Sequence, residues 1–392
     1  MKTKITQEYL LPLSFFLGFL TAYFVPFKID VFVFITDIFV KTFLLFAPLI
    51  VFIIIFASTC SLQSEKASLG RFVKISVVMY ISLTFLSAIF ASFILSISLL
   101  ANRSRVGGNG ILEAYSQIYQ TILMNLSNLV FPAIIVGFAA PLLLARTRYF
   151  HKILRASKYL NSGEEIFFKI LIKILPLICL SLGARLYYDL GQVALDAYIT
   201  SMGLIFALGI LFLMGFLLTI RRLMSKKINQ MYRYSKETFL TALTIGSSYI
   251  FLPLNIKIFG RYFEMDKRVR DFILTLGASL NRCGSVMGVL VVIFVSALYN
   301  NYGLSWQQML SLAIPVALLG FGSPGIHGGT LLVTLSVILQ MLSPSNPEKF
   351  ASTALALFVG GTSFPQVAVN SVTTGYVALL VDHFAHGEVS KH

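Results

Sequence analysis

Polar residues that could bind a small solute or an ion lie inside two apolar segments of this 392-residue chain. Asn281 and Arg282 interrupt one segment among small residues. The other carries polar residues three or four positions apart, which places them on one stripe of a helix: Ser363, Gln366, Asn370 and Thr374. An arginine inside a membrane span costs at least ~2.5–3.5 kcal/mol and should face a partner or a cavity. The alternatives are helix packing around Asn281–Arg282 and interhelical hydrogen bonding along the stripe.

Both segments also carry residues that loosen a helix. Gly277, Ser279 and Gly284 flank Asn281, and they favour local unwinding that would free backbone carbonyls for a ligand. Pro365 removes one backbone hydrogen bond from the helix that bears the stripe.

Two further apolar stretches are broken at their middle by small polar residues. The first break includes Ser247 and Ser248, and the second runs from Gly322 to Gly329. Each half is too short to cross a hydrocarbon core of ~30 Å, which needs ~20 helical residues. Non-helical backbone at membrane depth survives only where protein or a water-filled cavity satisfies it. We therefore predict two re-entrant helical hairpins, at 238–260 and 312–342, whose tips line a transport site near the midplane.

The elements that position these residues are predicted to be membrane helices. With 57% hydrophobic and 12% charged residues and a mean hydropathy of +0.83, the chain is expected to be an all-α integral membrane protein. Its net charge of +15 arises from basic residues in short connections, so no nucleic-acid partner is expected. Cys60, Cys179 and Cys283 have neither disulfide nor metal spacing. Apolar runs predict eight spanning helices besides the hairpins, at 9–27, 33–59, 73–101, 121–145, 166–188, 196–220, 272–299 and 352–382.

The basic connections also predict the orientation of the chain. Lys and Arg gather in the loops after the second, fourth and sixth helices, and Arg103 and Arg105 are the main exception. Because basic loops stay inside, both termini are expected in the cytoplasm, with the protein in the inner membrane. The hairpins then enter from opposite sides, as inverted repeats require. The first apolar run lacks a small-residue cleavage site, so we expect a membrane helix rather than a signal peptide.

Four motifs occur in a familiar order. The two hairpin breaks are similar to a serine-rich tip and to a second, glycine-rich tip. The segment from Gly277 to Ser285 is similar to Gly-Ala-Thr-x-Asn-Met-Asp-Gly-Thr, and the segment from Val369 to Gly375 to a final-helix motif. Together they resemble the dicarboxylate/amino acid:cation symporters, nearly end to end. The resemblance implies a homotrimeric, elevator-type transporter in the lipid bilayer, with scaffold helices in 1–71 and 102–195 and a transport domain in 72–101 and 196–392.

The chain departs from this resemblance where charge would be bound. The motif aspartate of the seventh helix is Cys283, and its methionine is Arg282. In the last helix, Ser363 replaces an aspartate for a substrate ammonium, Gln366 an arginine for a distal carboxylate, and Thr374 a sodium-binding aspartate. We therefore expect sodium coupling to be lost or altered. Arg282 would either stand in for the coupling cation or bind a substrate carboxylate.

The resemblance implies secondary transport of a small organic solute, either a carboxylate or an amino acid. No cofactor is expected; a coupling cation could be sodium or a proton, and the missing aspartates argue against sodium. The alternative is a derivative that no longer transports and serves as an anion-conducting pore or a sensor. An enzyme is not expected, because no nucleophile–base pair or metal constellation lies in a span. Substrate contacts are expected from Ser247, Ser248, Arg282, Ser285, Gly325, His327, Ser363, Gln366 and Asn370. The cation site or its surrogate is expected at Gly277, Ser279, Asn281, Arg282, Cys283, Asn370 and Thr374.

Two charged features have simpler interpretations. A lone histidine at a hairpin tip, such as His327, is either solvated or able to titrate with closure of the tip, since its ordinary pKa is ~6.5. Arg185 and Asp189, four positions apart, are expected to form an interfacial helix pair without a role in transport.

Overall fold

A computed structural model describes residues 2–24, 29–102, 176–223, 228–243, 248–321, 323 and 329–386, with a few isolated positions between 103 and 175. Within these ranges every regular element is a helix. Four segments are long and apolar enough to cross a membrane: 74–100, 194–223, 269–299 and 363–384. The predicted span at 121–145 and both hairpin tips lie largely outside the described residues.

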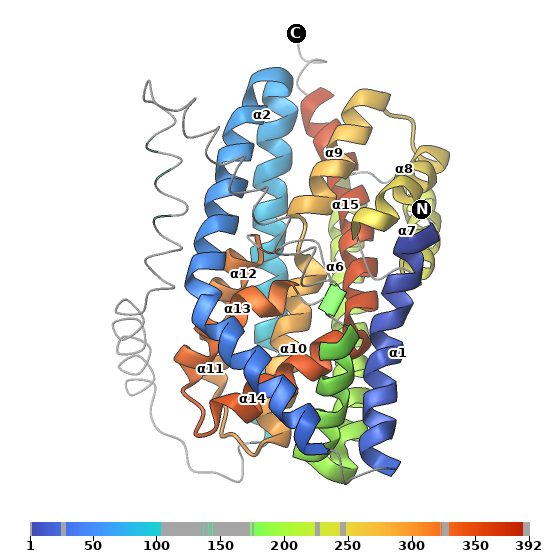
Figure 1. Cartoon of the computed structure of the whole chain (residues 1–392). Coiled ribbons are helices and arrows are strands. Elements are labelled where there is room, and N and C mark those ends of the chain that lie inside the picture. The colour runs from blue at the N-terminus through green and yellow to red at the C-terminus, as the bar shows by residue number, and fades with distance from the viewer. Residues whose placement is uncertain are drawn as a thin grey trace.

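Of the first two helices, one fits the predicted pattern and the other does not. Helix α1 (Lys2–Phe24) matches the first predicted span. Helix α2 (Ile29–Asn102) covers 74 residues without the predicted break between 59 and 73. A straight helix of that length would extend about 110 Å, far beyond a bilayer. Figure 1 shows instead that α2 rises in blue and descends in cyan, so that it reverses direction and supplies two passes. The prediction of a non-helical connection was wrong, and the connection contains no proline that would have enforced one.

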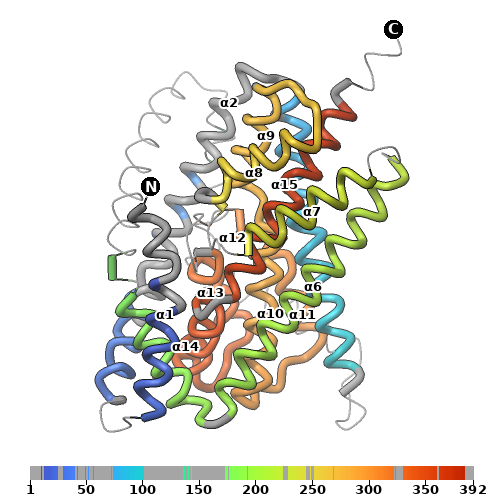
Figure 2. Tube along the Cα trace, turned by 90° about the vertical axis from the view of Figure 1, so that its right-hand side faces the viewer, coloured from blue at the N-terminus to red at the C-terminus, as the bar shows by residue number. Residues whose placement is uncertain are grey.

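Helical pairs take the places of both predicted hairpins. The first consists of α7 (Ile228–Ala242) and α8 (Ser248–Tyr262). The second consists of α12 (Ala313–Phe321) and α13 (Gly329–Leu342), and it is preceded by the short α11 (Trp306–Ser311). The arms of each pair lie against one another. Figures 1 and 2 show the two hairpins at different heights of the bundle.

The seventh predicted span is divided at its polar pair. Helix α9 (Lys267–Leu280) ends and α10 (Cys283–Tyr299) begins around Asn281 and Arg282, neither of which is helical. The predicted unwinding is therefore confirmed. Helix α10 is buried from Cys283 to Ala297, so this largely apolar helix belongs to the centre of the molecule.

The last predicted span begins earlier and contains an irregular turn. Helix α14 (Pro347–Leu357) continues through a π-helical turn, η5 (Phe358–Thr362), into α15 (Ser363–His386). Two glycines in η5 and the proline three residues further on explain why the regular hydrogen-bond ladder is interrupted here.

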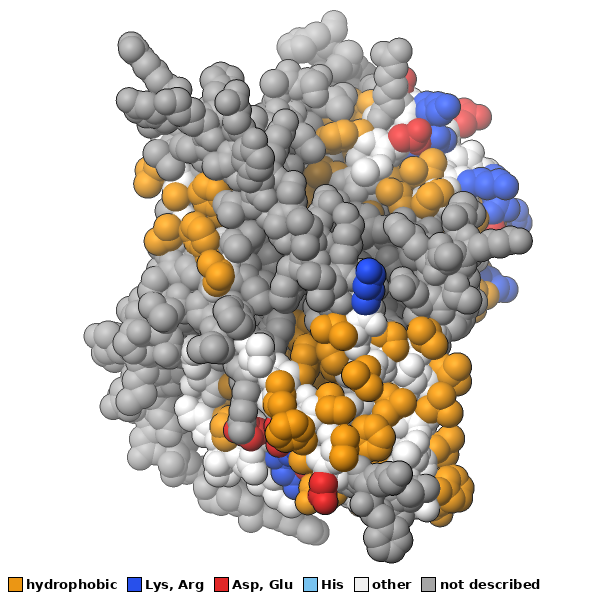
Figure 3. All heavy atoms as spheres, in the orientation of Figure 1, with side chains coloured by type: hydrophobic (Ala, Val, Ile, Leu, Met, Phe, Trp, Pro, Cys, Tyr) orange, Lys and Arg blue, Asp and Glu red, His pale blue; other side chains and the backbone are white. Residues whose placement is uncertain are grey.

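The buried fraction of each span separates the core from the periphery. The 269–299 and 363–384 segments are 89% and 94% buried, whereas 74–100 and helix α6 (Ala194–Leu223) are only 44% and 33% buried. Helix α6 follows a described helix over 176–190 and the short η3 (Gly191–Val193). Exposed leucines and aromatic residues cover α1, and Figure 3 shows this apolar face at the lower right, with charged side chains at the upper right. The polar break is thus held at the centre, and apolar surface faces outward.

Candidate functional site

Asn281 joins the break between α9 and α10 to the middle of α15. Its side chain is fully buried. Nδ2 lies 2.8 Å from the Asn370 carbonyl oxygen, 2.6 Å from Thr373 Oγ1 and 2.9 Å from Thr374 Oγ1. Two N–H groups are therefore shared among three oxygens. The Thr374 hydroxyl in turn donates to the Asn370 carbonyl at 2.7 Å, so these oxygens already have partners within the protein.

Asn370 caps the start of α10 from the facing helix. The Gly284 N–H donates to Asn370 Oδ1 at 2.7 Å, and Asn370 Nδ2 donates to Ser285 Oγ at 3.1 Å. Arg282 occupies the N-cap position of α10 but forms no side-chain cap. The first N–H groups of a helix need an acceptor, and an asparagine oxygen supplies one here across the helix interface. The predicted polar stripe therefore faces the predicted break.

Arg282 connects the break to the second hairpin. Its side chain is only 4% exposed, and Nη2 donates to the Ser323 carbonyl oxygen at 2.9 Å. Ser323 is also tied within the hairpin, because its hydroxyl lies 2.9 Å from Thr330 Oγ1. A guanidinium thus supplies the donor for a carbonyl at the hairpin tip, where no regular helix continues.

Neutral groups fill the positions where the resemblance places motif aspartates. The Cys283 thiol is buried beside the hydroxyls of Thr84, Ser87 and Thr373. A Cβ atom built on Gly277 would lie 2.3 Å from Thr374 Cγ2 and 2.5 Å from the Tyr80 hydroxyl, so α9 approaches α15 and α2 closely here. Among the described residues, no group of three or more His, Cys, Asp or Glu side chains could hold a metal ion.

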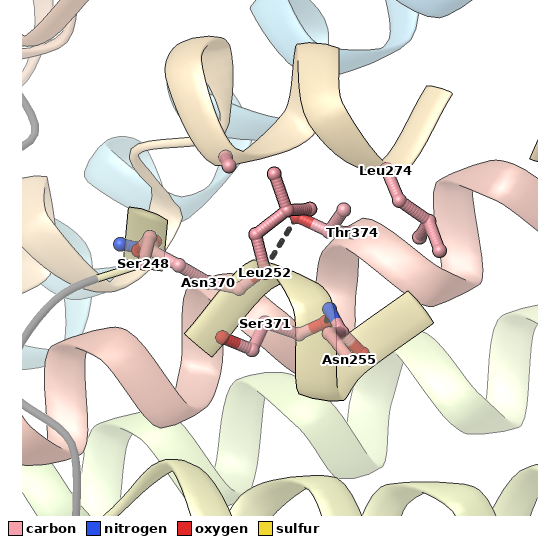
Figure 4. Close-up of a pocket in the computed structure, with 8 residues that line it drawn as sticks. Ser248, Leu252, Asn255, Leu274, Asn370, Ser371 and Thr374 are labelled. Atoms are coloured by element: carbon pink, nitrogen blue, oxygen red, sulfur yellow. Dashed lines mark hydrogen bonds between the residues drawn. The ribbon is translucent and has the colours of Figure 1, made fainter. Parts of the chain in front are cut away.

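A small cavity lies between the first hairpin, α9 and α15 (Figure 4). Its volume is about 10 Å³, the lower limit for a single water molecule. Figure 4 shows Ser248, Leu252 and Asn255 of α8 facing Asn370, Ser371 and Thr374 of α15. Asn255 and Ser371 were not predicted to be site residues. The asparagine in an otherwise apolar hairpin arm was the feature of the sequence that could have indicated Asn255.

Gln366 lies apart from the Asn281–Asn370 network. Its Nε2 donates to Thr362 Oγ1 at 3.2 Å, and Cβ atoms built on Gly284 and Gly288 would approach Gln366 atoms within 2.3 and 2.5 Å. The two glycines thus form a groove in α10 that the Gln366 backbone and amide occupy. Ser363 is buried at the start of α15.

The structure brings together part of the predicted site. Ser279 lies on the last turn of α9, just before the break, and donates to the Thr275 carbonyl, with its side chain half-buried. Ser247, Gly325 and His327 lie outside the described residues. The break, the polar stripe and the described part of the second hairpin tip meet through Asn281, Arg282, Ser285, Asn370 and Thr374.

Comparison with known proteins decides the family. A model of the sodium:dicarboxylate symporter family matches residues 9–384. The chain belongs to that family. Membership in the sodium:dicarboxylate symporter family identifies a membrane transporter of a solute, and it confirms the resemblance drawn from the motifs.

Three relatives of this chain illustrate the range of similarity within the family. The serine/threonine transporter SstT of Acinetobacter baylyi is 22% identical over 387 residues, covering 94% of this chain and 95% of that protein. The excitatory amino acid transporter 1 of Ambystoma tigrinum is 31% identical over 111 residues, which are 28% of this chain and 20% of that protein. Its Homo sapiens counterpart is 29% identical over 111 residues, again 28% of this chain and 20% of the relative.

Proposed function

We propose that this protein is a secondary transporter of a small organic solute whose sodium coupling is lost or altered, with Arg282 acting as a tethered cation. The observation that carries the proposal is the bond from the buried Arg282 guanidinium to the Ser323 carbonyl. In place of a mobile ion, a covalently attached charge would link the unwound segment to the second hairpin.

Electrostatics supports this proposal. A sodium ion about 4 Å from a guanidinium would be disfavoured by about 4 kcal/mol at an effective dielectric constant near 20. Cys283 and Thr374 supply no compensating negative charge. The Asn370 carbonyl, an oxygen of the kind that sodium would need, already accepts bonds from Asn281 and Thr374.

The substrate is proposed to be a monocarboxylate or a small neutral solute. Ser363 offers no anion for an ammonium group, and Gln366 offers no cation for a distal carboxylate. An acidic amino acid would leave charges unpaired in a desolvated site, at several kcal/mol. The similarity to a serine/threonine transporter is compatible with a small solute. Recognition would use Ser248, Ser285, Asn370 and, in its second possible role, Arg282.

The proposed assembly is a homotrimer in the inner membrane with both termini cytoplasmic. Each protomer would move a transport domain (72–101 and 196–392) against a scaffold (1–71 and 102–195) by an elevator mechanism. Cross-linking in native membranes should trap trimers, whereas species no larger than dimers would contradict the assembly.

Uptake by proteoliposomes tests the central claim. We would load vesicles with purified protein and measure uptake of labelled lactate, serine, succinate and aspartate in sodium and in potassium buffers. We expect lactate or serine to accumulate equally in both buffers and aspartate to be excluded. Uptake that rises steeply with sodium concentration would overturn the tethered-cation proposal. Ionic conductance without solute flux would contradict transport itself.

A further inference from the structure

A second polar cluster lies away from the proposed binding site. Its centre is Arg185, on the helix over 176–190, whose side chain is 9% exposed. Nη1 donates to Asp37 Oδ1 of α2 at 2.9 Å, and Nε donates to Asp189 Oδ2 at 2.7 Å. The predicted pair of Arg185 and Asp189 is therefore present, but it is part of a larger network.

Asp189 also binds α14. Its carboxylate is 4% exposed, and Oδ2 accepts a hydrogen bond from Ser352 Oγ at 3.0 Å. Lys349, one turn earlier on α14, contributes a favourable positive charge. The pKa of the Asp189 carboxyl is raised, because the effect of burial exceeds the lowering effect of the bonds from Arg185 and Ser352. The partners on both sides thus offset only part of the cost of burying the charged form.

The cluster joins elements that the proposed function assigns to different domains. Asp37, Arg185 and Asp189 belong to the scaffold ranges. Helix α14 belongs to the transport domain and packs against α10 and α13. The 176–190 helix ends one residue after Asp189, and Gly191 turns the chain with a positive φ of 58°. Asp189 therefore lies at the junction between the two domains.

We propose that Asp189 is a positioning residue that latches α14 to the scaffold and holds the transport domain in the arrangement seen here. This inference rests on the proposed function, because a latch matters only if the two domains move. The latch is the bond to Ser352, and the bonds within the scaffold stay in place during release.

The chemistry makes release reversible. When α14 departs, Asp189 keeps its bond to Arg185 and is not left without a counter-charge. The Ser352 hydroxyl lies 2.9 Å from the Lys349 carbonyl of its own helix and can donate there instead. Each group therefore has a partner after separation. Loss of one hydrogen bond to a charged group corresponds to about a tenfold change in the population of the latched state.

Distances between spin labels test the latch without a known substrate. Labels would be attached to Leu177→Cys in the scaffold and Leu298→Cys on α10, because both positions are exposed. Cys60 would be replaced by serine, and Cys179 and Cys283 are buried. We expect one dominant distance in the otherwise unchanged protein. Ser352→Ala should increase the ratio of the minor to the dominant population about tenfold.

Thr353→Ala is the matched control. The Thr353 hydroxyl is also buried and donates to the Lys349 carbonyl at 2.9 Å. This bond lies within α14, whereas the bond from Ser352 reaches Asp189. We expect Thr353→Ala to leave the distances unchanged. Asp189→Asn should also increase the minor population, and adding Ser352→Ala to it should produce little further change, because both act on one bond.

Two results would overturn the latch. The first would contradict the latch alone, and the second would also contradict the proposed transport mechanism. If two distances occur but neither Ser352→Ala nor Asp189→Asn changes their ratio, the latch is wrong while movement of the domains stands. If every variant keeps one fixed distance and proteoliposomes show no uptake, the latch fails together with the proposed transport mechanism.

Discussion

The two hairpins are attached to the rest of the protein in different ways. In the first, the buried Tyr234 hydroxyl lies 2.8 Å from Asn255 Oδ1 and 3.2 Å from the Ser371 carbonyl, and Asn255 Nδ2 donates to the same carbonyl at 3.2 Å. These bonds fix both arms to α15. The second hairpin packs through apolar residues against α2 and α10, and Arg282 binds its tip.

This difference indicates which hairpin can move at lower cost. Buried hydrogen bonds are directional, and breaking one leaves a polar group without a partner. Apolar contacts are not directional and tolerate small displacements better. The first hairpin is therefore expected to behave as a fixed wall of the site. The second is expected to move when the Arg282 bond is released.

The largest expected effect comes from disturbing the anchored hairpin. A Cβ atom built on Gly375 would lie 2.1 Å from the Tyr234 hydroxyl oxygen and 2.4 Å from the adjacent ring carbon. The ring is confined by Phe259 and Phe263, with centroids 5.7 and 5.6 Å away. Gly375→Ala should therefore reduce the free energy of unfolding by about 3 kcal/mol, the upper end for overpacking.

Thermal unfolding in detergent measures this effect. Gly203→Ala serves as the control, because nothing lies within 4 Å of a Cβ atom built at Gly203. Equal melting temperatures for the two variants would show that the first hairpin is not rigidly anchored.

The next effect concerns the bond at the second hairpin. Arg282→Met leaves the Ser323 carbonyl without this donor, at a cost of about 1–3 kcal/mol. If the arginine stabilises the unwound segment, the melting temperature should fall with or without solute. If it is a ligand, stability should change little and stabilisation by organic anions should disappear. Exposed Arg222→Met is the control, and an unchanged response in both assays would remove Arg282 from either role.

A smaller effect is expected for overpacking in the second hairpin. A Cβ atom built on Gly320 would lie 2.7 Å from Val286 Cγ1, at the end of a side chain rather than against backbone. Gly320→Ala should cost about 1 kcal/mol, because the apolar interface can adjust. Melting temperatures measured beside those of Gly375→Ala test the contrast directly. A larger loss for Gly320→Ala would reverse it.

The smallest effect is expected from His327, which the sequence predicts to lie at the tip of the second hairpin. If this histidine titrates during closure, His327→Gln should flatten the dependence of uptake on pH between about 5 and 8 while leaving stability unchanged. His383→Gln, exposed on α15, provides the comparison. An identical pH profile for both variants would leave His327 as a solvated side chain.

Local patterns predicted the parts of the fold that depend on local chemistry. Polar breaks within apolar stretches predicted both hairpins, although α7 begins at Ile228 and the first hairpin was predicted to begin at 238. The small residues around Asn281 predicted the break between α9 and α10. Helical spacing correctly placed Asn370 and Thr374 on one stripe facing that break. The i to i+4 spacing also predicted the bond between Arg185 and Asp189.

Partners that are distant in sequence could not be predicted in the same way. Tyr234 and Asn255 meet Ser371 only because α7 and α8 both lie against α15 at that level. Ser352 reaches Asp189 across 163 positions of sequence. The direction of the Gln366 amide depends on the groove at Gly284 and Gly288, which no property of α15 alone reveals. No local feature of the sequence distinguished the helical connection in the middle of α2 from a loop.

The π-helical turn η5 separates the final helix into two parts, α14 and α15, whose directions can change independently. A π turn contains one residue more than the regular helix it replaces, and one residue corresponds to a rotation of about 100°. This extra residue sets the direction of Ser352 relative to that of Asn370. Deleting Gly360 or Gly361 would therefore turn α14, which carries Ser352, relative to α15, which carries Asn370. A single-residue insertion or deletion at η5 would change how α14 meets Asp189 while conserving the contacts of Asn370 on α15.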